Sequence, residues 1–412
     1  MSVSKQLPTN LHEKITEIAK NGEKFGVAVS GGGDSIALLC ILIKWANENR
    51  KQIFVVTVNH NLRPDSVEDA ILVKNLCSKN NVNHSVLEIR ESVKGNLQSW
   101  ARDNRYRLIC EWANNKGIDS IFLGHTLDDQ AETFLLRLAR GSGVDGLTAM
   151  TSKSYRDGIF WLRPLLHITR KDLRKFLDDK HIPYVNDPSN ENLRFDRIKI
   201  RKVLDSAKEY GLEAARLVET SQRLAQAREV LNHVAFQFAK KHVLLTEIGT
   251  VTIDLSGIEL LFPETRHRIL SYSIKWVSGN PYGARAKTLE NAFFEVMNGK
   301  SRTCCGCIIS KFDGKLHISR EFSAVKNCQA LKNIWDKRWF CPPDMKIRAC
   351  GEDGLVQIKN WKTFKLPRHA LLAMPTLWND ENLLDHLLNE GQFSKIKSIN
   401  NNNDFYEGIL AH

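Results

Sequence analysis

The sequence predicts an α/β fold, in which a parallel sheet with helices on both faces is followed by a helical and mixed region and by a small α+β region. Over the first 140 residues, short apolar runs alternate with segments of helical spacing. Most of the short runs are largely apolar, as is typical of strands that are buried on both faces. The first run also ends in three consecutive glycines, which favour a sharp turn from a strand into a helix.

The expected elements alternate along the chain. Strands are expected at 26–30, 53–59, 84–89 and 120–123, and helices at 35–49, 67–79, 97–116 and 129–140. This order predicts parallel strands that are joined by crossover helices. Ligands bind beyond the carboxyl ends of such strands, so the segments that directly follow the strands are the first candidates for a functional site.

The remainder of the 412 residues predicts two further domains. A helical and charged stretch at 209–241 is followed by short strands across 251–316 with a helix at 289–297, whereas the last part is rich in Trp and in short apolar runs. The expected domains are therefore 1–205, 206–325 and 335–412. The sequence leaves the oligomeric state open, and a homodimer is one of the alternatives.

Charge and cysteine content restrict the class of protein. The net charge of +12 favours a polyanionic partner, with nucleic acid as the natural candidate; a basic surface that serves only solubility is the alternative. No stretch approaches the ~20 apolar residues of a membrane span, and the first residues lack the apolar core of a signal peptide. Nine cysteines, mostly isolated within apolar segments, predict reduced thiols and a cytoplasmic protein without membrane contact.

A glycine-rich loop directly follows the first expected strand, and it consists of Ser30, Gly31, Gly32, Gly33, Asp34 and Ser35. Because the glycines carry no side chains, the backbone can turn tightly and direct its N–H groups at an anion. Asp34 or Ser35 is expected to cap the next helix, whose N-terminus adds a partial positive charge. The loop lacks the lysine of a Walker A motif but still predicts a phosphate-binding site. An ordinary strand–turn–helix connection is the alternative.

A group of carboxylates follows the fourth expected strand, just after Gly124 and His125. Asp128, Asp129 and Glu132 lie at the expected start of a helix, where residues three apart share a face. Clustered carboxylates can hold Mg²⁺, bind a substrate amine or act as a base. The alternative is structural, with the two aspartates capping the helix and Glu132 completing a capping box.

Basic residues follow other segments of this half. His60 and Arg63 come directly after the second expected strand, where they are candidates for contact with a nucleotide. The turn at 186–190 precedes a basic run, in which Arg197 and Arg201 are candidates for a phosphate clamp or an RNA contact. A solvated helix face is the more usual explanation of such a run.

Taken in this order, the segments resemble the bacterial tRNA(Ile)-lysidine synthase family of the pyrophosphate-loop ATPase superfamily. The matching segments are 30–35, 59–63, 124–133, 140–143 and 186–190, together with Arg197 and Arg201, and they cover most of residues 24–205. The glycine loop alone marks the superfamily, whereas the order of all the segments indicates the family. The resemblance implies a Rossmann-like pyrophosphate-loop ATPase domain that is followed by two smaller tRNA-binding domains.

The resemblance also implies a two-step reaction. ATP adenylates the C2 oxygen of the cytosine at the first anticodon position of the isoleucine tRNA with a CAU anticodon, and pyrophosphate leaves. The ε-amine of free L-lysine then attacks C2 and expels AMP, so the enzyme is a ligase that forms a C–N bond. The product reads AUA instead of AUG and is charged with isoleucine.

The resemblance further implies roles for the residues of the matching segments. ATP binding is expected from Ser30, Gly31, Gly32, Gly33, Asp34, Ser35, His60 and Arg63, and Mg²⁺ binding from Asp34. Lysine and the reacting cytosine are expected near His125, Asp128, Asp129, Glu132 and Arg197. The expected catalytic residues are Asp34, Asp128, Asp129, Glu132 and Arg201. Many members carry a second His where this chain has Thr126, so no role of that His is carried over.

The C-terminal half is expected to bind the tRNA. The candidates for phosphate and stacking contacts are scattered basic and Trp residues: Arg266, Arg268, Arg285, Lys287, Lys337, Arg338, Trp335, Trp339 and Trp361. A small-domain core is the more usual explanation of each Trp.

Three other functions fit parts of the sequence. Cys304, Cys305 and Cys307 would suit the iron–sulfur cluster of a tRNA thiolase, although no partner set accompanies them and a strand of buried thiols is the alternative. A non-catalytic tRNA-binding protein would not need the complete loop and carboxylates. A small-molecule ligase would not need the basic charge.

Overall fold

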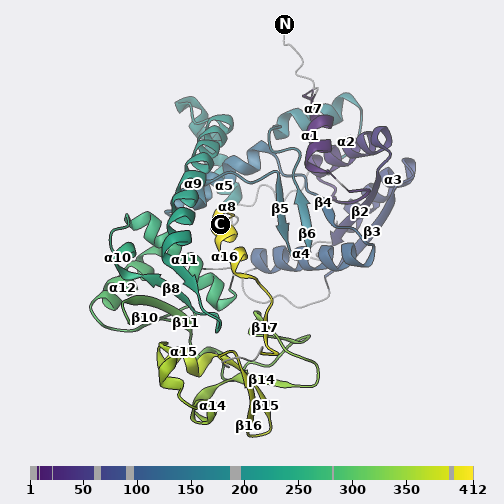
Figure 1. Cartoon of the computed structure of the whole chain (residues 1–412). Helices are drawn as coiled ribbons and strands as arrows, with labels where there is room; N and C mark the ends of the chain where they lie inside the picture. The colour runs from purple at the N-terminus through teal and green to yellow at the C-terminus, as the bar shows by residue number, and fades with distance from the viewer. Residues whose placement is uncertain are drawn as a thin grey trace. The chain divides into compact units, whose positions relative to one another are not determined.

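The computed structural model describes residues 7–8, 10–20, 22–59, 66–89, 97–185, 196–280, 283–388 and 394–411. The chain forms two compact units, Met1–Gln226 and Ala227–His412 (Figure 1). The expected division into three domains stays a prediction. No helix in the described ranges is long and apolar enough to cross a membrane.

The first unit is built on a six-stranded sheet. Its strands are β1 (Lys24–Ala28), β2 (Gln52–Asn59), β3 (Asn83–Glu88), β4 (Ser120–Phe122), β5 (Lys153–Arg156) and β6 (Ile159–Leu162). Their order is β3-β2-β1-β4-β6-β5, and all neighbours are parallel except β5 and β6. The expected α/β fold with four parallel strands is confirmed, whereas the β5–β6 hairpin is an addition that the sequence pattern does not indicate. The chain reverses its direction of winding between β1 and β4, which is where ligands bind in open parallel sheets.

Helices cover both faces of this sheet (Figure 1). Helices α1 (Leu11–Ile18), α2 (Gly33–Asn49), α3 (Ser66–Lys79) and α7 (Arg170–Asp179) share one core with the strands, and α4 (Leu97–Asn115) shares the other. Helices α5 (Leu127–Ala139), α6 (Val144–Leu147) and α8 (Asp196–Ala207) contribute to a separate small core. The long helix α9 (Ala214–His242) contains the boundary between the two units.

The alternation of side chains along β2 separates two hydrophobic cores. Ile53 and Val55 pack into the core that contains α1, α2 and α7, whereas Phe54, Val56 and Val58 belong to the core formed with α4. Successive residues of a strand point to opposite faces, so a strand that is apolar at every position can serve both cores. This explains why the run at 53–58 shows no polar alternation.

The second unit contains a five-stranded antiparallel sheet of order β7-β8-β11-β10-β9. Its strands are β7 (Val243–Leu245), β8 (Val251–Asp254), β9 (Arg302–Cys304), β10 (Cys307–Phe312) and β11 (Lys315–Arg320). The helices of this part are α10 (Leu255–Ile258), α11 (Pro263–Ser278), α12 (Ala286–Met297) and α16 (Asn402–Leu410). The C-terminal helix returns to this core, where Phe405 and Ile409 pack with Ile274 and Ile318.

The rest of the second unit consists of short elements around separate small cores. One three-stranded sheet contains β12 (Ile334–Trp335), β13 (Trp339–Phe340) and β17 (Lys397–Ser398). The other contains β14 (Lys346–Ala349), β15 (Pro375–Asn379) and β16 (Asn382–His386). The helices are α13 (Phe322–Val325), α14 (Gly351–Gln357) and α15 (Arg368–Ala373). Trp335 and Trp339 are both buried in one of these cores, which confirms the structural explanation of these two Trp residues.

The close packing of β1 against α4 leads to a first prediction. A Cβ atom added at Gly26 would lie 3.0 Å from both Trp112 and Ile121, tighter than ordinary van der Waals contact. We expect Gly26→Val to lower the free energy of unfolding by about 1–3 kcal/mol through overpacking of this core. Urea unfolding followed by circular dichroism measures the change. Gly143→Ala is the matched control because no atom lies within 4 Å of an added Cβ there, and equal stability of both variants would contradict the prediction.

Candidate active site

The glycine loop connects the carboxyl end of β1 to the start of α2. Gly31 has a φ of +90°, a conformation that side chains rarely adopt, so the turn requires glycine at this position. The Ser35 hydroxyl donates to the carbonyl of Gly32 at 2.9 Å and accepts from the backbone N–H of Ser30 at 3.2 Å. The loop is therefore held by its own serines.

The expectation that Asp34 or Ser35 caps α2 is wrong. Gly32 is the N-cap residue, and no side chain makes the capping bond. Asp34 lies within the first turn of the helix instead. An N-terminus without a side-chain cap suits an anion-binding loop, because a capping side chain would compete with the anion for the backbone N–H groups.

The second motif lies beside this loop. A Cβ atom added at Gly124, which follows β4, would lie 3.3 Å from the carbonyl oxygen of Asp34. Thr126 caps α5 by accepting from the N–H of Asp129, and the Asp129 carboxylate accepts from the Thr126 N–H at 2.9 Å. The capping explanation thus holds for Asp129. It also accounts for Thr126, because the N-cap position favours Thr over His.

Arg170 lies at the centre of the predicted carboxylates, at the first position of α7. Its guanidinium group contacts Asp34 at 3.1 Å, Glu132 at 3.2 Å and Asp129 at 3.3 Å. Its backbone N–H donates to Asp128 at 2.7 Å. Four carboxylates from α2 and α5 therefore meet at the start of α7.

Helix α8 adds two more arginines on the other side of the group. Arg201 donates to the Glu132 carboxylate at 2.6 Å, and Arg197 lies 3.9 Å from Asp129. Only 1% of the Glu132 side chain is exposed, so this residue is part of a buried ion network and does not complete a capping box. The four carboxylates face three guanidinium groups, which leaves the cluster with a net negative charge when all are ionised.

Some polar atoms of the cluster have no hydrogen-bond partner. Asp34 Oδ1, Glu132 Oε2 and His125 Nδ1 are buried and unpartnered within the part of the chain that the structure describes. Leaving a buried polar group unpaired costs roughly 1–3 kcal/mol, and more when the group is charged. Free carboxylate oxygens in a negatively charged cluster suit a cationic ligand that would bind between them.

Burial and ion pairing shift the pKa values of the cluster in different directions. Burial raises the pKa of Asp34, and Arg170 offsets this only in part. Burial also acts to raise the pKa of Asp129, but Arg170, the Thr126 hydrogen bond and Arg197 outweigh it, so the pKa is lowered. Burial lowers the pKa of His125 to about 4, and this imidazole is therefore neutral at pH 7.

The structure brings most of the predicted residues of the first unit to one place. Asp34, Asp128, Asp129, Glu132, Arg197 and Arg201 form one network with Arg170, while Ser30, Gly31, Gly32, Gly33 and Ser35 form the adjacent loop. His125 precedes the cap of α5 and interacts electrostatically with Asp129. His60, Arg63 and the turn at 186–190 lie outside the described residues.

Sequence reasoning misses Arg170. The residue follows Thr169, which caps α7 by accepting from the N–H of Asp172. A basic residue in the first turn of a helix is unfavourable for the helix dipole. Arg170 and Lys171 at a clear helix start are thus the one local signal that an acidic partner lies nearby.

The residues present fit a magnesium ion that is held jointly with a nucleotide. Among the described residues, no group of three or more His, Cys, Asp or Glu side chains could hold a metal ion alone. Mg²⁺ is commonly bound through one or two carboxylates together with substrate phosphates. The unpartnered Oδ1 of Asp34, next to the glycine loop, is a suitable protein ligand for such an ion.

The cysteine cluster forms a β-hairpin. Cys304 ends β9 and Cys307 begins β10, opposite each other, while Cys305 is exposed in the turn. Burial raises the pKa of Cys304 to about 11 and that of Cys307 to about 12, so both are thiols at pH 7. Buried strand thiols are the explanation that the structure supports.

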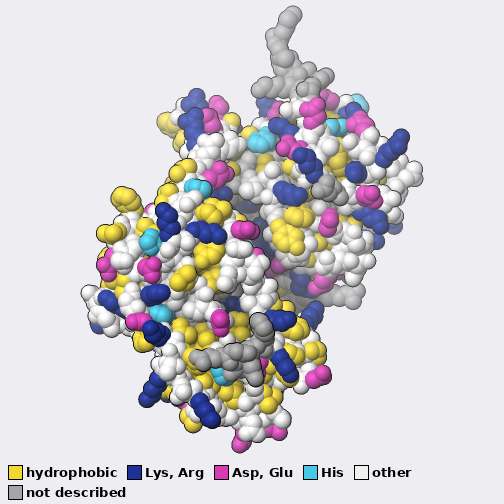
Figure 2. All heavy atoms as spheres, viewed as in Figure 1, with side chains coloured by type: hydrophobic (Ala, Val, Ile, Leu, Met, Phe, Trp, Pro, Cys, Tyr) yellow, Lys and Arg dark blue, Asp and Glu magenta, His cyan; other side chains and the backbone are white. Residues whose placement is uncertain are grey.

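The candidate tRNA contacts of the second unit divide into two kinds. Arg268 is buried between Asn232 and Glu264, and Arg338 is buried against Asp336, so each guanidinium group has an acidic partner within the fold. Arg285, Lys287 and Lys337 are exposed. On the face shown in Figure 2, Lys and Arg side chains are spread among Asp and Glu over both units.

Comparisons with known proteins agree with the geometry of the site. The PP-loop domain family matches residues 4–207. The tRNA(Ile)-lysidine synthase of Ruegeria pomeroyi is 36% identical over 413 residues, which cover 97% of this chain and 97% of the relative. That of Wolbachia sp. subsp. Brugia malayi is 35% identical over 402 residues, covering 93% and 92%. Among solved structures, the U34-tRNA thiolase NcsA from Methanococcus maripaludis has a TM-score of 0.46 and 16% identity, covering 53% of this chain and 78% of that chain; this similarity is too low to carry an argument.

The central position of Arg170 predicts a pH-dependent loss of stability in Arg170→Met. Arg170 helps to hold the pKa of Asp129 below its unfolded value, so its contribution is present above pH ~4 and is lost as the pH falls through the folded pKa. We expect the variant to lose about 3–5 kcal/mol of unfolding free energy at pH 7, because buried carboxylates are left without a counter-ion.

Urea unfolding at pH 7 and at pH 3 tests this prediction. The difference between wild type and variant should shrink at pH 3, which is below the unfolded pKa of the carboxylates. Arg174→Met, which removes an exposed arginine of the same helix, is the matched control. A loss that is equal at both pH values would show that Arg170 acts through packing alone.

Proposed function

The chain belongs to the tRNA(Ile)-lysidine synthase family, and on this basis we propose that it joins free L-lysine to C2 of the wobble cytidine of the CAU-anticodon isoleucine tRNA. ATP is consumed to AMP and pyrophosphate in this reaction. The observation that carries the proposal is the partly buried network of four carboxylates and Arg170 beside the glycine loop. Substrates of this kind place the enzyme in the cytoplasm.

The glycine loop supports the first step, the adenylation of cytosine. Its backbone and the start of α2 bind the ATP phosphates, because an uncapped helix N-terminus attracts anions. Asp34 would hold Mg²⁺ together with the phosphates, and the ion would neutralise part of the phosphate charge. Arg197 and Arg201 lie at the cluster and stabilise the negative charge that develops on the leaving pyrophosphate.

The carboxylates support the second step, the attack by lysine. The net negative charge of the cluster and the unpartnered Oε2 of Glu132 favour the lysine ammonium group. Only the neutral amine is a nucleophile, so a carboxylate must accept a proton before attack. The lowered pKa of Asp129 suits a permanent ion pair, and Asp34 is assigned to Mg²⁺, so Asp128 and Glu132 are left as the candidates for the proton acceptor.

Arg170 and His125 have supporting roles in this proposal. Arg170 separates the carboxylates at fixed distances before lysine arrives, which limits the reorganisation that binding requires. His125 is neutral at pH 7, so it offers a hydrogen bond to the cytosine without adding a positive charge. A neutral imidazole leaves the negative charge of the site available for lysine.

Radiolabelled lysine provides the test of this function. The full chain with ATP, Mg²⁺ and labelled lysine should incorporate label into the CAU isoleucine tRNA and not into the initiator tRNA, although both share the anticodon. Asp34→Asn should lower lysine incorporation and tRNA-dependent pyrophosphate release by at least roughly 100-fold, because the Mg²⁺ ion at the phosphates would lose its charged protein ligand.

Asp205→Asn is the control for this variant. Asp205 is exposed on α8 and pairs with Lys208, so its loss should leave incorporation unchanged. Absence of label in the wild-type reaction, with intact folding and ATP binding, would refute lysine ligation. Appearance of sulfur in the tRNA would instead indicate a thiolase.

A further inference from the structure

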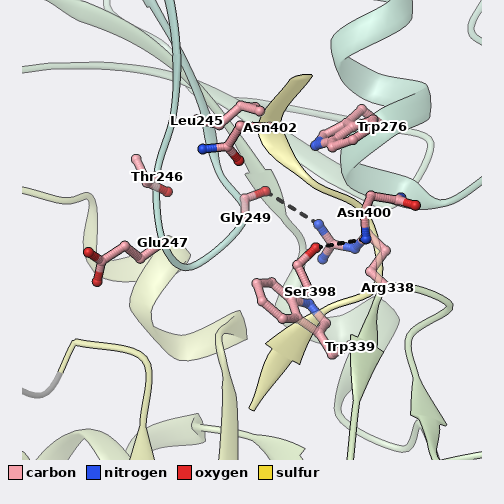
Figure 3. A pocket seen from close by; sticks show the side chains of 10 residues that line it. All are labelled: Leu245, Thr246, Glu247, Gly249, Trp276, Arg338, Trp339, Ser398, Asn400 and Asn402. Carbon is pink, nitrogen blue, oxygen red and sulfur yellow. Dashed lines mark hydrogen bonds between the residues drawn. The ribbon is translucent and has the colours of Figure 1, made fainter. Parts of the chain in front are cut away.

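A cavity in the second unit is separate from the carboxylate network. It has a volume of about 120 Å³ and opens between the β7–β8 turn, helix α11, strand β13 and the segment from β17 to α16 (Figure 3). Its lining residues include Leu245, Trp276, Arg338, Trp339, Asn400 and Asn402. None of these residues takes part in the chemistry proposed for the first unit.

The floor of this cavity carries a buried positive charge. Asp336 accepts from Arg320 at 2.9 Å and from Arg338 at 3.0 Å, so one carboxylate is shared by two guanidinium groups. The Arg338 side chain is only 9% exposed, and it also donates to the Gly249 carbonyl at 3.3 Å. One positive charge of this trio is uncompensated, which favours an electron-rich ligand.

Two donors at the cavity have no acceptor. Arg338 Nε and Trp339 Nε1 are buried and unpartnered within the described residues. Trp339 is 3% exposed, so bulk water does not reach most of its ring. Such donors are satisfied by an ordered water or by acceptor atoms of a ligand.

The walls of the cavity are suited to a flat ring. Figure 3 shows the indoles of Trp276 and Trp339 approaching the same space from different elements. The side chains of Asn400 and Asn402 add amide donors and acceptors at the rim. A cavity of roughly 150 Å³ holds benzene, so about 120 Å³ takes up part of a larger ring, and the rest of that ring would lie at the open mouth of the cavity.

We propose that this cavity binds one unpaired nucleobase of the RNA substrate. Sequence-specific RNA recognition commonly uses splayed bases, which stack on aromatic side chains and bond through their edges to amides. Lys337 and Lys397 are exposed and adjoin the lining residues Arg338 and Ser398, so they are placed for the flanking phosphates. The exposed Glu247 on the rim disfavours a phosphate on its own side. The inference rests on the proposed function, which supplies the RNA.

Binding of short RNAs tests the proposal on the full chain. Fluorescein-labelled single-stranded heptaribonucleotides of C, U or A are compared with a blunt RNA duplex by anisotropy. Trp276→Leu should weaken single-strand binding roughly 5- to 150-fold, the loss expected for one stacked base. The double variant Asn400→Ala with Asn402→Ala should weaken it roughly 5- to 10-fold, and neither should change duplex binding.

The rim variants keep the test independent of folding. Asn401, which caps α16, is left in place, and Asn400 bonds to Ser398 through its backbone N–H, which alanine retains. Asn403→Ala is the matched control, because Asn403 is an exposed asparagine of the same run that does not line the cavity. The proposal would be overturned if Asn403→Ala and the double variant lost the same single-strand affinity. It would also be overturned if the cavity variants lost as much affinity for the duplex as for the single strand.

Two further outcomes separate this proposal from the proposed function. If single-strand binding responds to the cavity variants but no lysine is incorporated, the cavity proposal stands and lysine ligation fails. If the wild-type chain incorporates lysine, and the cavity variants keep its KM for tRNA and its affinity for the oligonucleotides, the cavity proposal alone is overturned. Tight binding of free CMP, UMP or AMP, sensitive to the variants while oligonucleotide binding is not, would overturn RNA as the source of the base.

Discussion

The guanidinium group of Arg170 joins acidic side chains of two helices that would otherwise repel one another. Asp34 comes from α2, Asp129 and Glu132 from α5, and Arg170 itself begins α7. Four neighbouring carboxylates, of which Asp129 and Glu132 are buried, would be unstable without this charge at their centre. The start of α7 is therefore an electrostatic requirement of the site as well as part of the fold.

This arrangement leaves the cluster incomplete in a way that suits its chemistry. The arginines neutralise most of the negative charge, yet Asp34 Oδ1 and Glu132 Oε2 stay without partners among the described residues. A site whose carboxylates are held in place by ion pairs can bind a cation with little reorganisation. Ion pairing lowers the pKa of Asp129 and keeps this carboxylate charged, whereas burial raises the pKa of Asp34 and so favours a cation as its partner.

The second unit uses a different solution to hold short elements together. Strands of two residues, such as β13 and β17, offer few backbone hydrogen bonds. Asp336 compensates by binding Arg320 at the end of β11 and Arg338 beside β13, and Arg338 extends this link to the β7–β8 turn through Gly249. The C-terminal helix adds Phe405 to the core of the five-stranded sheet. The same buried arginine that links these elements also forms the floor of the cavity.

The sequence by itself determined the parallel strands, the glycine loop and the acidic start of α5, because these features are written in local periodicity and in residues with special backbone or capping preferences. Tertiary structure alone decided the partner of the carboxylates. Arg170 lies 136 residues from Asp34 along the chain, and only the crossovers of the sheet bring the two together. The tertiary structure likewise decided that Arg268 and Arg338 are buried. A basic residue whose acidic or amide partner is distant in the sequence has the same neighbouring residues as an exposed one. Long-range ion pairs depend on which elements become neighbours, and that information is spread over the whole fold.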